Sequence, residues 1–84
     1  MQINKALSCK EIDSEFFMLD HATSTVHVFN DTGNLIIAGL KRGDDTAKII
    51  HSLTECFDVP KEEAEQDFFI FMEQLRSANV LVNS

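Results

Sequence analysis

The chain has 84 residues, of which 44% are hydrophobic and 25% charged, and its formal net charge is −7. A chain of this length is expected to form one domain, residues 1–84, with a modest core, since it buries only about 60–65% of its unfolded surface. Residues 1–42 carry four basic and five acidic side chains (−1), and residues 43–84 carry three basic and nine acidic ones (−6). Because this charge repels phosphate, DNA and RNA are not expected as partners.

Three strands are expected in the first thirty residues. Lys5–Lys10 has a weak strand pattern. Glu15–Asp20, EFFMLD, has a stronger one, with its four apolar side chains placed alternately on two faces. Thr25–Phe29, TVHVF, is rich in β-branched and aromatic residues, which favour strands. The connection of about four residues between the last two segments predicts an antiparallel hairpin.

The rest of the chain shows three helical patterns. The first begins at a polar cap, Asn30 or Asp31, and ends at Gly43, a typical stop signal. The second covers about Thr46–Phe57. The third and longest covers about Pro60–Ala78, and the last residues, VLVNS, return as a short extended segment.

The third helix has more apolar residues than one buried stripe requires. Phe69 and Met72 lie beside the stripe, with Glu65 and Arg76 at their edges. These extra residues either belong to the core, or form a dimer interface, or line one wall of a binding groove. The residues of the core stripe recur at i, i+4, i+7 and i+11: Ala64, Phe68, Phe71 and Leu75.

No catalytic or metal-binding pattern is present in the sequence. His21, His27 and His51 show no metal-ligand spacing, and Cys9 and Cys56 form no CxxC pair. The glycines are isolated, so neither a phosphate-binding loop nor a nucleophile elbow is expected. The sequence therefore predicts a protein that is not an enzyme and that uses no cofactor and no metal.

A cytoplasmic protein is the expectation for the compartment. No apolar run approaches the ~18 residues of a membrane span, so no contact with a membrane is expected. The N-terminal residues, MQINKALSCKEID, contain no continuous apolar segment of the kind found in a secretion signal. Two scattered cysteines in such a protein are normally reduced.

The order of these signals resembles the PqqD-like family, the pyrroloquinoline quinone synthesis protein D group. The resemblance covers about residues 13–82. Its segments are, in chain order, HVFN, DTGNLIIAGL, a glycine, TAKII, DVPKEEAEQD and FFIFMEQLRSANVL.

The resemblance implies an α+β, winged-helix-like fold with a three-stranded antiparallel sheet packed on three helices. Members of this family are peptide chaperones that bind the leader of a ribosomally made precursor peptide as an added strand. They present the leader to a modifying enzyme, often a radical-SAM enzyme. Carried onto this chain, the site comprises the strand edge and the exposed side of the third helix: Thr25, Val26, His27, Val28, Phe29, Glu65, Phe69, Met72 and Arg76.

Three alternatives to a leader-binding adaptor of quinone biosynthesis remain open. The first is a leader-binding protein of another modified-peptide pathway, such as that of a lasso peptide. The second is a winged-helix nucleic-acid binder, which the acidic second half opposes. The third is a homodimeric interaction module that buries the strand edge together with Phe69 and Met72.

Overall fold

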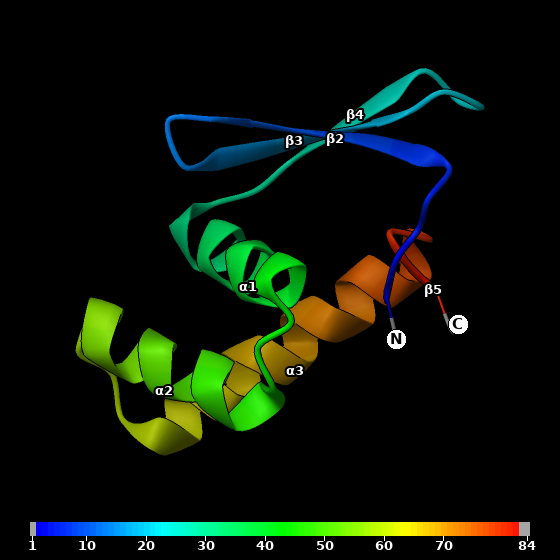
Figure 1. Ribbon diagram of the computed structural model, residues 1–84. Helices are drawn as coiled ribbons and strands as arrows, with labels where there is room; N and C mark the ends of the chain where they lie inside the picture. The colour runs from blue at the N-terminus through cyan, green and yellow to red at the C-terminus, as the bar shows by residue number, and fades with distance from the viewer. Residues whose placement is uncertain (1, 83–84) are drawn as a thin grey trace.

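The computed structural model describes residues 2–82 and consists of a sheet layer above a layer of three helices (Figure 1). The strands β2, β3 and β4 form an antiparallel sheet in that order, and β1 pairs with β5 in a separate two-stranded ribbon. This arrangement confirms the expected α+β fold. The elements are, in chain order, β1 Gln2–Ile3, β2 Leu7–Ile12, β3 Glu15–Asp20, β4 Thr25–Val28, α1 Asp31–Arg42, α2 Thr46–Phe57, α3 Lys61–Ser77 and β5 Leu81–Val82.

The first strand of the sheet lies two residues later than the sequence predicts. Ile12 pairs with Glu15, so Asp13 and Ser14 form the whole turn, with φ angles of 52° and 66°. A two-residue turn with both φ angles positive matches the twist of the flanking strands. The prediction of Lys5–Lys10 was wrong because this tight turn, which lacks the usual Asn-Gly signal, extends the strand as far as Ile12.

The helix boundaries follow from local hydrogen bonds. Asn30 is the cap of α1, where its side chain accepts a 2.8 Å hydrogen bond from the N–H of Gly33. Asp45 caps α2 in the same way through the N–H of Lys48, also at 2.8 Å. Gly43 ends α1 with φ 82°, the left-handed conformation expected of a helix stop.

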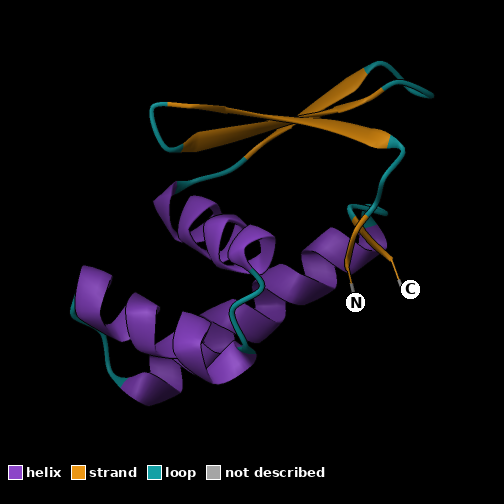
Figure 2. Cartoon of the chain, in the orientation of Figure 1, coloured by secondary structure: helices purple, strands orange, loops and turns teal. Residues whose placement is uncertain are grey.

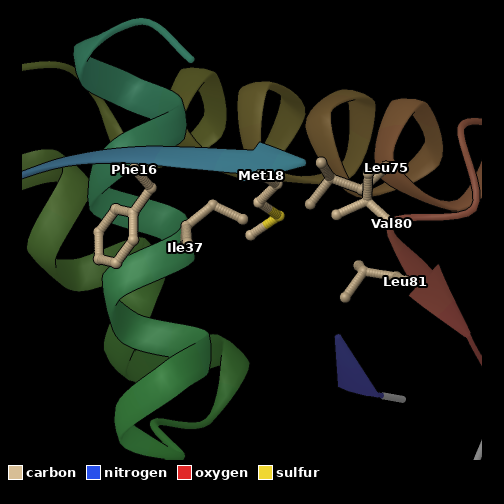
Figure 3. Packing of buried hydrophobic residues seen from close by; sticks show 6 residues of the cluster. All are labelled: Phe16, Met18, Ile37, Leu75, Val80 and Leu81. Atoms are coloured by element: carbon tan, nitrogen blue, oxygen red, sulfur yellow. The ribbon is translucent and has the colours of Figure 1, made fainter. Parts of the chain in front are cut away.

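The core consists of two clusters, one between the sheet and the helices and one among the helices. Phe16 and Met18 point from β3 toward Ile37 of α1, and Leu75, Val80 and Leu81 complete this cluster (Figure 3). A second cluster joins the three helices and contains six buried residues: Ile36, Ile49, Ile50, Leu53, Ala64 and Phe68. Met72 and the half-buried Phe71 pack against both clusters.

The β1 strand was not predicted, but the expected extended tail is present as β5, and its last residues, 83–84, lie outside the described residues. Cys56 and Phe57, the last two residues of α2, are exposed. Among residues 2–82, no helix is both long enough and apolar enough to cross a bilayer.

Candidate functional site

The strand β4 forms one edge of the three-stranded sheet. Within the described residues it pairs with β3 alone, so its other side carries free backbone groups. His27 is the cross-strand partner of the buried Met18 and therefore faces the helices. Val26 and Val28 alternate with it and face away from the helices.

A hollow of about 280 Å³ lies between β4 and the C-terminal half of α3. It extends from the end of β4 to the segment that follows α3, and it has both polar and apolar walls. Its lining residues are His27, Val28, Phe29, Asn30, Phe71, Gln74, Leu75, Ala78 and Val80. A free strand edge beside a hollow is the arrangement to which an extended peptide adds.

Aromatic packing holds the end of β4 against α3. The rings of Phe29 and Phe71 meet edge to face, with their centroids 5.8 Å apart. Gly33 permits this approach, since a Cβ at that position would lie 2.8 Å from Cε1 of Phe71. The hollow therefore has a fixed wall where the strand passes into α1.

The buried side chain of Asn34 joins the ends of β3 and β4. Its Oδ1 accepts a 2.9 Å hydrogen bond from the N–H of Phe16, and its Nδ2 donates a 3.2 Å hydrogen bond to the carbonyl of Phe29. The next pair in the ladder, Phe17 with Val28, is a direct cross-strand pair. The amide of Asn34 thus bridges the two strands at the point where they separate.

The structure divides the predicted site residues between two regions of the surface. All five strand positions, Thr25–Phe29, lie along or immediately after β4, and His27, Val28 and Phe29 line the hollow. The predicted helical positions do not line it. They are Glu65, Phe69, Met72 and Arg76.

The spacing of residues along α3 explains this division. Phe69 and Phe71 are two residues apart, which places them roughly 200° apart around the helix. Phe71, Gln74 and Ala78 form the flank that faces β4. Phe69 instead contributes to a separate hollow of about 730 Å³ between α2 and α3. Phe69 and Met72 therefore do not line the hollow beside the strand.

The two extra apolar residues of α3 also differ in exposure. Phe69 is 55% exposed, and its neighbour Ile70 is 58% exposed. Met72 is half-buried and packs against both core clusters. This position agrees with the alternative that Met72 belongs to the core. Gln74 and Ala78 were missed, although their i+3 and i+7 spacing from Phe71 places them on one flank.

The titratable groups do not gather at the hollow. The side chain of Arg42 donates hydrogen bonds to Asp44, which lowers the pKa of that carboxyl group. Asp44 follows α1 and does not line the hollow. Within residues 2–82, no group of three or more His, Cys, Asp or Glu side chains has a geometry suited to a metal ion.

The fold and the free strand edge define a small α+β domain with a hollow between an edge strand and a long helix. The family model described as coenzyme PQQ synthesis protein D (PqqD) matches residues 15–81. This match covers most of the chain, and the protein belongs to the PqqD family.

Two solved structures share this fold over nearly the whole chain. TbiB1 in complex with the TbiA(beta) leader peptide superposes with a TM-score of 0.90 at 24% identity, covering 100% of this chain and 98% of that one. Lasso peptide synthetase B1 complexed with the leader peptide gives a TM-score of 0.87 at 23% identity, covering 98% and 96%. A comparison with curated protein sequences found no match.

Proposed function

We propose that this protein is a non-catalytic adaptor that binds the leader of a ribosomally made precursor peptide and presents it to a modifying enzyme. The leader pairs with the free edge of β4, and its alternate side chains enter the hollow beside α3. The observation that carries the proposal is the position of this hollow, which is lined by the edge strand and by the helix together.

The direction of the backbone groups in β4 follows from the β2–β3 turn. In a two-residue hairpin the closing pair, here Ile12 and Glu15, is hydrogen bonded, so the N–H and C=O of Glu15 point toward β2. These groups alternate along β3, which directs those of Met18 toward His27. The N–H and C=O groups of Val26 and Val28 consequently point toward the free edge.

The side chains of a peptide added at this edge also alternate between the two faces of the sheet. Its backbone pairs with Val26 and Val28, and every second side chain points to the inner side of the sheet, as His27 does. These side chains meet Phe71, Gln74 and Ala78 across the hollow. Main-chain pairing supplies affinity in this mode, and the pocket supplies specificity.

The family and the two structural neighbours support the same class of function. PqqD is described as a coenzyme PQQ synthesis protein, and both neighbours were solved as complexes with a leader peptide. The family name points to quinone biosynthesis, whereas the name of one neighbour points to lasso-peptide biosynthesis. The proposal therefore concerns modified peptides in general. The partner enzyme, of the radical-SAM type in the quinone case, would meet the precursor in the cytoplasm.

The test is calorimetric titration with a synthetic leader peptide, taken from a short precursor-peptide gene where one lies beside the gene of this protein. Val28→Pro removes a donor that faces the free edge and leaves the ladder to β3 intact, since proline is tolerated on the outer side of an edge strand. We expect leader affinity to fall at least tenfold, which is about 1.4 kcal/mol.

Val28→Thr is the matched control, because it retains both the backbone N–H and a β-branched side chain. We expect this variant to bind the leader within about threefold of the original protein. Equal binding by Val28→Pro and Val28→Thr, with both variants folded, would place the leader elsewhere.

A further inference from the structure

A short ribbon made from the two ends of the chain lies beside the end of α3. In this ribbon β1 pairs with β5 in antiparallel register, Gln2 with Val82 and Ile3 with Leu81. Figure 2 shows both strands near the C-terminal end of α3, apart from the three-stranded sheet. The ribbon therefore adjoins the segment after α3, which forms one end of the hollow beside β4.

Asn4 connects this ribbon to the end of the hollow by hydrogen bonds. Its backbone N–H donates to the carbonyl of Val80 at 2.7 Å, and its Nδ2 donates to the carbonyl of Asn79 at 2.9 Å. Its Oδ1 accepts a 3.0 Å hydrogen bond from the N–H of Ala6, which fixes the orientation of the amide. One side chain thus orders its own loop and also holds a segment 75 residues further along the chain.

The segment that Asn4 holds is a turn in the wall of the hollow. Asn79 has φ 60°, a left-handed conformation that is uncommon for residues other than glycine. Its two neighbours, Ala78 and Val80, both line the hollow. Val80 is buried in the core and its N–H donates to the carbonyl of Leu75 at 2.8 Å, whereas Ala78 is exposed. The conformation of this turn therefore determines where Ala78 lies in the wall.

We propose that Asn4 is a positioning residue for the leader, because its amide holds the turn at Asn79 and so sets the end wall of the hollow. This inference rests on the proposed function, since it concerns the same hollow. Asn4 does not line the hollow and acts through Ala78 and Val80. A wall that is ordered before the leader arrives lowers the cost of ordering on binding.

The test compares Asn4→Asp with the original protein by calorimetric titration with the synthetic leader, at a temperature at which both are folded. Aspartate has nearly the same shape, keeps an acceptor for Ala6 and loses the donor for Asn79. We expect leader affinity to fall about fivefold or more, because the wall is no longer pre-organised. In NMR spectra of the free variant, the amide resonances of Ala78 and Asn79 should move, and that of Val28 at the strand edge should not.

A second variant and two controls separate the hydrogen bond from charge and from stability. Asn4→Ser adds no charge, offers Ala6 an acceptor and is too short to reach Asn79, so it should weaken leader binding to a similar extent. Lys5→Gln changes the net charge as Asn4→Asp does, at an exposed neighbour, and should bind the leader within about twofold of the original. Asp45→Ala removes the cap of α2, which lowers stability away from the hollow, and should also bind within about twofold.

A purely structural role for Asn4 predicts that Asn4→Asp resembles Asp45→Ala, with a lower melting temperature and unchanged leader affinity. That result would overturn the inference, and so would an equal loss of affinity in Lys5→Gln. If Asn4→Asp does not fold, Asn4→Ser decides the outcome.

The failure of this inference is distinguishable from the failure of the proposed function. Normal leader binding by the Asn4 variants contradicts only the positioning role. An original protein that binds no leader contradicts the adaptor function and, with it, this inference.

Discussion

At the scale of single residues, Asn34 connects the fold to the proposed site. It is 7% exposed, and its amide satisfies one donor on β3 and one acceptor at the end of β4. Buried polar groups are normally paired, and the separation of two strands would leave these two without partners. Asn34 thereby fixes where β4 ends and where Phe29 meets Phe71.

We predict that Asn34→Leu destabilises the protein by about 2 kcal/mol or more. The substitution leaves the buried N–H of Phe16 and the partly buried C=O of Phe29 unpaired, and each such loss costs about 1–3 kcal/mol. Urea denaturation measures the free energy of unfolding. Asn30→Ala is the control, because it removes only a helix cap and should cost about 1 kcal/mol. A smaller loss for Asn34→Leu than for Asn30→Ala would contradict the bridging role.

At the scale of elements, α3 presents two flanks with different surroundings. One flank, with Phe71, Gln74 and Ala78, faces β4 across the hollow. The other, with Phe69, borders the space between α2 and α3. Gln74 and Ala78 also border a hollow that Phe69 and Ile70 line. We expect a leader strand on β4 to meet the first flank.

We predict that substitutions on the two flanks change leader affinity by different amounts. Ala78→Phe fills part of the 280 Å³ hollow and should weaken leader binding at least tenfold. Phe69→Ala should change leader affinity less than about twofold. Calorimetric titration with the same leader measures both, and thermal melts confirm that both variants fold. A large loss for Phe69→Ala with normal binding by Ala78→Phe would place the leader between α2 and α3.

The sequence was sufficient to predict most elements, because their signals are local. The alternation of EFFMLD predicts β3, and the glycine at 43 predicts the end of α1, where the structure has φ 82°. Asn79 follows α3 with φ 60°, a left-handed conformation that asparagine tolerates better than most residues. Each of these signals depends only on residues that are close together in the chain.

The facing flank of α3 could not be predicted in the same way. Phe69 and Phe71 are identical side chains two positions apart, and composition does not distinguish them. The choice depends on how α3 crosses beneath the sheet, which the packing of Leu75 and Phe71 against the first cluster determines. The position of β2 likewise depended on its pairing with β3 across the Asp13-Ser14 turn.

At the scale of the whole molecule, the surfaces are separated by the two-layer architecture (Figure 1). The hollow lies between the layers at the β4 edge, the uncovered face of the sheet lies on the side away from the helices, and the acidic charge is concentrated in the helical half. The proposed adaptor would have to bind a peptide while another surface stays free for a modifying enzyme. The separation of these surfaces suits that role.

The most direct test of strand addition is amide hydrogen exchange of the backbone, measured by NMR with and without saturating leader. In the free protein the amide of His27, which pairs with β3, should be protected, and those of Val26 and Val28 should exchange freely. Saturating leader should slow exchange at Val26 and Val28 at least tenfold and leave His27 nearly unchanged. Unchanged exchange at Val26 and Val28 in the saturated complex would contradict the account, because no leader strand would then be paired with β4.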